Sequence, residues 1–305
     1  MYYNRNLIGA DKSAVTPKDA SGIFDLRSQE KHQRHQNWPG SVDNFLIYTI
    51  NYSGTAFDVR QNGTNYINID WGDGSSEVSN LTSVTHTYSS NGIYKIKLNT
   101  TLGSIFYRPN FSAATSASRN QLIKIETGRY VTGSLDSSFR GCSNLEEIIA
   151  PAISFCSVTN FRRVFRDCSS LEAFPSVETK NISNFENAWW GCSSLTAFPK
   201  LDFTSATKFT GAWNGCTSLA DFPPKMFDKT GDFSSTNNFS NAWNNCALTA
   251  QSIENILVSL DTNGDTGIPL TISGGTSASY STWSQAAKDA LTNLQNKSWT
   301  VTYNS

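Results

Sequence analysis

The sequence has few of the residues on which catalysis and metal binding usually depend. It contains three histidines among 305 residues, and two of them, His32 and His35, lie in a polar N-terminal stretch. It has no C-x-x-C pair of the kind that binds zinc and no glycine-rich loop of the kind that binds phosphate. A carboxylate pair of the glycosidase type is an alternative, but nothing singles one out. We expect no catalytic residues, no metal centre and no cofactor.

The sequence also has little charge and no long apolar segment. Charged residues make up 16% of the chain and the formal net charge is −1, so nucleic acid is not an expected partner. No stretch approaches the 18 or so apolar residues of a membrane span, and the opening residues lack the apolar part of a signal peptide. We expect neither membrane insertion nor export by a signal peptide.

What the sequence does contain is a phrase repeated five times between Leu135 and Leu248. Each copy holds an aromatic residue, a cysteine three residues later and a leucine just beyond. The cysteines follow one another at intervals of 26, 24, 24 and 30 residues, at Cys142, Cys168, Cys192, Cys216 and Cys246. A repeat of this length predicts stacked units whose equivalent residues form one continuous core.

Two apolar rows and the row of cysteines are predicted to line that core. The apolar rows are Leu135, Phe161, Phe185, Phe209 and Phe239, and then Phe139, Phe165, Trp189, Trp213 and Trp243. Their spacing of four places both rows on one side of a helical turn. After the first four cysteines comes a leucine, followed three residues later by Ile148, Phe174, Phe198 or Phe222 and mostly by proline, which predicts a short strand. The five cysteines are expected to lie side by side as buried free thiols, while Cys156 lies off this row.

The repeated phrase, aromatic-x-G-C-S-S-L with a Phe four residues before the aromatic, resembles the BspA-type leucine-rich repeats of bacterial surface proteins and many phage proteins. The resemblance implies an α/β leucine-rich-repeat solenoid over residues 105–250. Its first repeat is degenerate and contains Ile105, Phe106, Leu122, Ile123 and Ile125. Terminal repeats are expected to be atypical because one side must meet something other than a repeat.

Residues 251–305 resemble the ending of the same family and would form an α/β cap. Apolar spacing predicts helices over 252–260 and 283–294, with strands on either side of the second. The acidic stretch Asp261–Asp265 is interpreted as a turn rather than a Ca²⁺ loop, because Ile272 stands where such a loop has its closing glutamate.

Residues 43–104 have the period-two pattern of β-strands. The order of Trp71-Gly72-Asp73-Gly74, His86-Thr87-Tyr88 and Gly92-Ile93-Tyr94 resembles a PKD domain, a small immunoglobulin-like β-sandwich that serves as a spacer or adhesive module. The chain is thus expected to be mainly β with short helices. His86 with Asp70 or Asp73 would be a catalytic or Ca²⁺ site in one interpretation, but we favour a structural role around the turn.

Residues 1–42 form the remaining segment. The phrase around Phe24 and Leu26, followed by Trp38-Pro39, resembles a short element of phage tail and virion proteins that precedes an exposed β domain. The resemblance implies that Phe24, Leu26 and Trp38 attach the chain to another virion protein. The alternative is a tail that packs on the next domain.

Two sets of residues are candidates for binding. Arg140, Arg166, Trp190 and Asn214 follow the second aromatic row, and their variation beside constant neighbours predicts that they face outwards. Trp190 would contact a sugar or a protein, unless it is packed in a crevice. On the strand half, Glu146, Glu172 and Asp221 predict a mildly acidic face, which is an ordinary solvated surface in the alternative interpretation.

The resemblances together imply a non-enzymatic virion structural protein of a bacteriophage, a tail fibre or other host-recognition component. Its partners would be other virion proteins and a glycan or protein on the host surface, and it would be a homo-oligomer exposed on the particle. A capsid decoration or cement protein is one alternative. A bacterial cell-surface adhesin is another.

Overall fold

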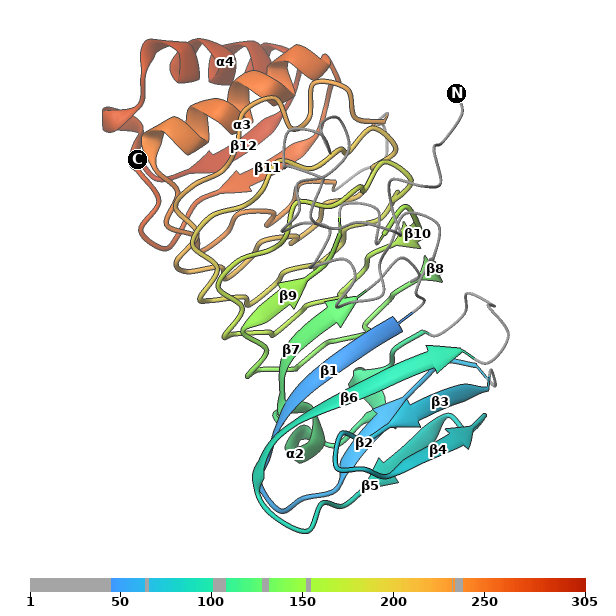
Figure 1. Cartoon of the computed structure of the whole chain (residues 1–305). Helices are drawn as coiled ribbons and strands as arrows, with labels where there is room; N and C mark the ends of the chain where they lie inside the picture. The colour runs from blue at the N-terminus through green and yellow to red at the C-terminus, as the bar shows by residue number, and fades with distance from the viewer. Residues whose placement is uncertain are drawn as a thin grey trace, which may run out of the picture. The chain divides into compact units, whose positions relative to one another are not determined.

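The computed structural model describes residues 45–63, 66–100, 108–127, 132–151, 155–231, 233 and 238–305. The chain divides into two units, Met1–Asp43 and Asn44–Ser305, and every described residue belongs to the second. Phe24, Leu26 and Trp38 therefore lie outside the described residues. The described part is mainly β with a few short helices (Figure 1), as the sequence predicts. It contains no helix that is long and apolar enough to span a membrane.

The first part of this unit consists of a two-stranded sheet and four strands of a larger sheet. Its strands are β1 (Phe45–Tyr52), β2 (Phe57–Arg60), β3 (Ile67–Asp70), β4 (Ser76–Ser79), β5 (Ser83–His86) and β6 (Gly92–Thr100). Strands β2 and β5 pair with each other, while β4, β3, β6 and β1 are neighbours in a larger sheet. Large side chains such as Tyr48, Phe57 and Trp71 are fully buried, because apolar residues alternate with polar ones along the strands.

The turn between β3 and β4 depends on glycine. Gly72 and Gly74 both have positive φ, at 79° and 94°. A Cβ on Gly72 would lie 2.4 Å from the carbonyl oxygen of Lys95, so only glycine fits there. The carboxylate of Asp70 accepts a hydrogen bond from the Gly72 N–H at 3.0 Å, and that of Asp73 accepts one from the Ser75 N–H at 3.0 Å. Both carboxylates thus satisfy the backbone of the turn.

The larger sheet continues from this first part into the repeats. Its order is β4-β3-β6-β1-β7-β9, in which β7 is Leu122–Thr127 and β9 is Glu147–Ile149. β7 pairs antiparallel with β1 and parallel with β9, so this one strand joins the antiparallel part of the sheet to its parallel part. Between β6 and β7 lie two short helical turns, η2 (Phe111–Ala113) and α2 (Ser116–Arg119). Hydrogen bonding in the sheet is therefore continuous across the expected boundary at 104/105.

The backbone hydrogen bonds of the repeats form two sets, one between successive copies and one within each copy. We call residues 135–141, 161–167, 185–191, 209–215 and 239–245 the turn row. In its second copy, the N–H groups of Phe161, Arg163, Phe165 and Asp167 donate to carbonyl oxygens of the next copy at 2.7 to 2.9 Å. Between them, the N–H groups of Val164 and Arg166 donate three residues back within their own copy, at 3.2 and 3.3 Å, and that of Arg162 donates to the side chain of Asn160 at 3.0 Å. Each copy is thereby tied to the next.

This pattern differs from the helical turns that the sequence predicts. Each copy has two residues with left-handed φ, five and one positions before the cysteine. They are Ser137 and Gly141, Arg163 and Asp167, Asn187 and Gly191, Gly211 and Gly215, and Asn241 and Asn245. Left-handed residues interrupt a right-handed helix and redirect every second N–H towards the neighbouring copy. The turn row is a series of linked turns and contains no α-helix.

Equivalent side chains of successive copies stack inside. The rings of Trp189 and Trp213 are parallel at 5.7 Å, and those of Trp213 and Trp243 at 4.8 Å. A second column consists of Phe185, Phe209 and Phe239, with centroid distances of 5.5 and 5.2 Å. The interior is a continuous apolar column, which a single 24-residue unit could not bury by itself.

The last copy is covered by the C-terminal segment. This segment contains α3 (Ala250–Asn263), β11 (Pro269–Ile272), η3 (Tyr280–Thr282), α4 (Gln285–Asn296) and β12 (Thr300–Tyr303). The N–H of Trp243 donates to Thr271 at 3.0 Å, so β11 takes the place of a further copy, and β12 pairs parallel with β11. The expected turn at Asp261–Asp265 is found only in part, because α3 continues through Asp261 to Asn263 and ends at Gly264 in the left-handed conformation. Lys297 donates to the carboxylate of Asp261 at 2.6 Å.

The longer loop between the fourth and fifth copies packs under this segment. Phe227 and Phe233 are fully buried. The Phe227 N–H donates to the hydroxyl of Ser259 on α3 at 2.8 Å, and the Phe233 N–H donates to Asp265 at 3.0 Å. The extra residues thus join the repeats to the cap.

Candidate binding surface

The expected binding residues belong to two different rows. Arg140, Arg166, Trp190 and Asn214 lie on the turn row. Glu146, Glu172 and Asp221 lie on the strand row, which we define as residues 146–149, 172–175, 196–199 and 220–223. Inward-facing cysteines and leucines such as Cys142 and Leu145 separate the rows along the chain. The two sets therefore do not form a single site.

Trp190 is half-buried and packed between neighbouring copies. The guanidinium carbon of Arg166 lies 4.7 Å from the centre of the Trp190 ring. From the following copy Gly211 approaches so closely that a Cβ there would lie 3.0 Å from Cε3 of the indole. Arg166 covers one face of the ring and Gly211 crowds its six-membered part, which leaves little room for stacking on a sugar. Its geometry matches the crevice-packed alternative.

Asn214 does not face outwards as the sequence predicts. Only 7% of the residue is exposed, whereas Arg140 and Arg166 are half-buried. Its carbonyl oxygen accepts from Gly191 at 2.8 Å, and the next N–H, of Gly215, donates to Asn244 at 2.9 Å. A short side chain between two closely stacked turns is shielded by both, so position in the phrase alone does not decide exposure.

The turn row carries more positive than negative charge in its first three copies. Sequence reasoning singled out Arg140 and Arg166 but missed Arg162 and Arg163. Arg162 pairs with Asp136 at 3.1 Å and with Glu186 at 3.3 Å, which lie in the copies on either side. These carboxylates raise the pKa of Arg162, against the opposing effect of burial. The sequence contained a signal for these pairs, because the charge alternates in sign at the equivalent positions Asp136, Arg162 and Glu186.

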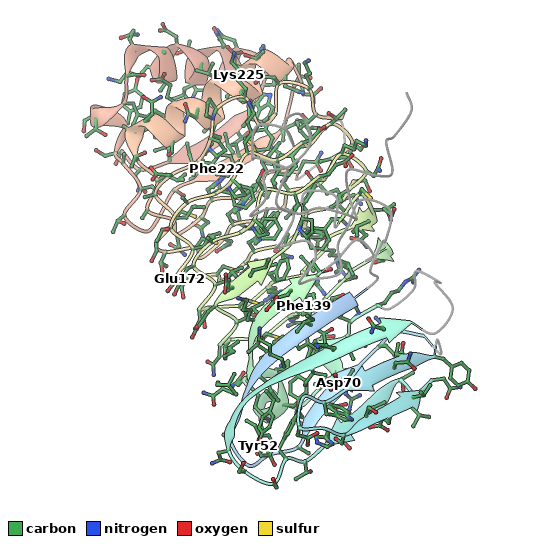
Figure 2. The ribbon with its side chains drawn as sticks, viewed as in Figure 1. Tyr52, Asp70, Phe139, Glu172, Phe222 and Lys225 are labelled. Carbon is green, nitrogen blue, oxygen red and sulfur yellow. The ribbon has the colours of Figure 1, made fainter. Side chains whose placement is uncertain are left out.

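The strand row has an exposed, acidic outer face, while Ile148, Phe174, Phe198 and Phe222 are buried in the core. Glu146, Glu172 and Asp221 are all exposed, and Glu172 lies at the margin of the molecule in the view of Figure 2. The isolated parallel bridges Ala173↔Ala197 and Ala197↔Asp221 align successive copies. Glu146 and Glu172 are adjacent on neighbouring copies, where the Glu172 N–H donates to the Glu146 carbonyl oxygen at 3.5 Å, whereas Asp221 is aligned with Ala173 and Ala197.

The five cysteines of the repeats form a buried column. Each is fully buried, and all are free thiols. The thiols of Cys168, Cys192, Cys216 and Cys246 each donate to the carbonyl oxygen of the aromatic residue in the preceding copy at 3.1 to 3.2 Å. Desolvation by burial raises the pKa of all five, that of Cys246 to about 12. Neutral thiols are poor nucleophiles and poor metal ligands.

His86 contributes to the packing of the β3–β4 turn. Its ring stacks on Trp71 at 4.6 Å, and its Nε2 lies 2.8 Å from the carboxylate of Asp73. Hydrogen bonds from Ser75, followed by the contact with His86, lower the pKa of Asp73 to about 2. In the described part of the chain, no group of three His, Cys, Asp or Glu side chains is arranged to hold a metal ion.

Comparison of the chain with protein-family models, with curated proteins and with solved structures finds no match. The function is therefore argued from the chain's own residues and from the resemblances of its motifs.

Proposed function

We propose that the chain is a non-enzymatic virion structural protein of a bacteriophage, acting as a tail fibre or other host-recognition component. In this proposal a PKD-like, immunoglobulin-like sandwich precedes a BspA-type leucine-rich-repeat solenoid with a C-terminal cap. The N-terminal segment attaches to another virion protein through Phe24, Leu26 and Trp38. The repeats present a surface to a glycan or protein of the host, and several copies assemble on the particle.

One observation carries the proposal. Five successive copies are tied by backbone hydrogen bonds, and their aromatic and cysteine side chains are buried in continuous columns. The polar side chains of the turn and strand rows are left outside, at a regular spacing set by the backbone. A regular, rigid outer surface suits adhesion, which gains affinity from area and needs no reactive group.

Competition for adsorption tests the proposal. Purified protein is added to host cells before the phage that encodes it, and free particles are counted over time. A host-recognition component occupies the receptors and slows adsorption, whereas a control protein of similar size does not. Adsorption that is unchanged at saturating protein contradicts the proposal. Antibody labelling of particles in the electron microscope then distinguishes a capsid decoration protein from a tail protein.

A further inference from the structure

Three arginines of the turn row lie side by side in the first two copies. The N–H of Gly141 donates to the carbonyl oxygen of Arg166 at 2.8 Å, so Arg140 and Arg166 stand next to each other on neighbouring copies. The N–H of Arg166 donates to Arg163 at 3.3 Å, so these two share one turn. All three residues are half-buried. We call Arg140, Arg163 and Arg166 the arginine cluster.

The carboxylates nearby do not neutralise the arginine cluster. The nearest carboxylate to Arg163 is Glu186, at 3.8 Å, and the same oxygen already lies 3.3 Å from Arg162. Within the described part of the chain, Arg166 pairs with one carboxylate, the exposed one of its neighbour Asp167, at 3.4 Å. Among the described residues, Arg140 forms no ion pair. Positive charge therefore accumulates on this part of a chain whose net charge is −1.

The fold does not require arginine at these positions. Later copies have Asn214 and Asn244 where Arg140 and Arg166 stand, and Asn187 and Asn241 where Arg163 stands. Like charges on adjacent strands are destabilising. Arg163 also has a φ of 55°, in the left-handed region that asparagine tolerates better. The fold thus accepts asparagine at these positions, which leaves the arginines available for a role outside stability.

We propose that the arginine cluster binds anionic groups, carboxylate or phosphate, of a polysaccharide on the host surface. Guanidinium groups bind such oxygens through paired, charge-assisted hydrogen bonds. The cation–π contact with Trp190 holds Arg166 in place before the ligand arrives, which lowers the entropy lost on binding. Equivalent groups one copy apart match a polymer whose charges repeat along its length. This assignment rests on the proposed host-recognition function.

The test compares polymers that differ in charge. Binding of the full-length protein is measured by affinity electrophoresis and calorimetry with polygalacturonate, with poly(glycerol phosphate), with neutral dextran and with a short DNA duplex. We expect binding to polygalacturonate or to poly(glycerol phosphate) that weakens with added salt, and no retention by dextran. A preference for polygalacturonate or for poly(glycerol phosphate) identifies the carboxylate or the phosphate as the ligand group. Tighter binding to DNA than to both, or binding to neither, overturns the proposal.

Matched variants locate the site. R140N/R163N introduces residues that other copies carry at the same positions, so the turn row remains intact. We expect it to bind the anionic polysaccharide at least about tenfold more weakly. The control K200Q/K229Q removes the same charge from exposed lysines outside the turn row and retains affinity. Equal loss in both variants, or none in R140N/R163N, overturns the proposal.

The adsorption experiment separates this inference from the proposed function. If wild-type protein and R140N/R163N block adsorption equally well, the host-recognition function stands and the arginine cluster is not its site. If neither blocks adsorption while the wild type alone binds the anionic polysaccharide, the cluster stands and the host-recognition function fails.

Discussion

The ring of Phe111 stacks on the ring of Phe139, with centroids 5.8 Å apart and an angle of 23° between the planes. Phe139 belongs to the first copy of the turn row. Phe111 also meets Tyr48 of β1 edge-on at 5.1 Å and Phe57 of β2 at 5.8 Å. One fully buried side chain therefore joins strands β1 and β2 to the repeats.

Replacing Phe111 by alanine tests this junction. The variant loses ring contacts with both regions, and we expect the free energy of unfolding to fall by about 3–5 kcal/mol. Hydrogen exchange should increase in β1 and in residues 135–141 together, because the same cavity borders both. The control Y66A changes a residue that is 57% exposed, and its stability should stay within about 0.5 kcal/mol of the wild type. Faster exchange in only one region would show that the two fold independently.

The left-handed φ of Gly215 predicts that the wild type is the most stable protein, followed by G215N and then by G215A. Its φ is 74°, and a Cβ there would meet nothing closer than 3.7 Å, so the conformation alone matters. We expect G215A to lower the free energy of unfolding by about 1–2 kcal/mol. G215N should cost less, because Asn245 holds the equivalent position at a φ of 58°. Urea unfolding followed by circular dichroism measures both variants. Equal stability of G215A and wild type would contradict the assigned backbone.

The buried cysteine column predicts a simple pattern of thiol labelling. Cys156 is half-buried, whereas the other five cysteines are buried and burial raises the pKa of each. Alkylation proceeds through the thiolate, so native protein at pH 8 should be modified rapidly at Cys156 alone. Mass spectrometry after digestion identifies the site. Unfolding in urea should make all six thiols reactive. Rapid labelling of Cys192 in the native protein would contradict the column.

The low pKa of Asp73 predicts a loss of stability in acid. Its folded pKa of about 2 lies below the ordinary value of about 3.9. The ionised carboxylate therefore stabilises the fold above about pH 4, and this contribution is lost as the pH falls from about 4 towards 2. D73N lacks it and should be roughly 1 kcal/mol less stable at pH 6.

Comparison of the wild type with D73N isolates the contribution of Asp73. The difference in melting temperature between wild type and D73N should shrink as the pH is lowered from 4 to 2. A difference that stays constant over this range would show that Asp73 does not carry the effect.

Some predictions from the sequence agree with the structure because their cause is local or periodic. The spacing of Ile253, Ile256, Leu257 and Leu260 predicts a helix, and all four are buried on α3. The helix is longer than predicted at both ends. Thr249 caps its start by accepting a hydrogen bond from the Ser252 N–H, and Gly264 ends it in the left-handed conformation. The strand pattern and the glycine turn around Gly72 likewise appear where the residues place them.

The candidate site was less predictable, because exposure depends on what lies on the neighbouring copies. Trp190 and Asn214 occupy the same position of the phrase. One is covered by the guanidinium of Arg166, and the other lies between two turns with 7% of its surface exposed. The pairing of Arg162 with Asp136 and Glu186 joins three copies. Such contacts become visible only when the register between copies is known.

The sequence by itself determined the period, the apolar and cysteine columns and the mainly β character, since each follows from residue type and spacing along one chain. Only the tertiary structure decided that each copy of the turn row contains two left-handed residues and forms linked turns rather than a helix. It also decided that β7 continues one sheet across the expected domain boundary at 104/105. It also decided which polar side chains remain outside. Hydrogen bonds between copies determine these features, and their partners lie more than twenty residues apart, beyond the reach of any local pattern.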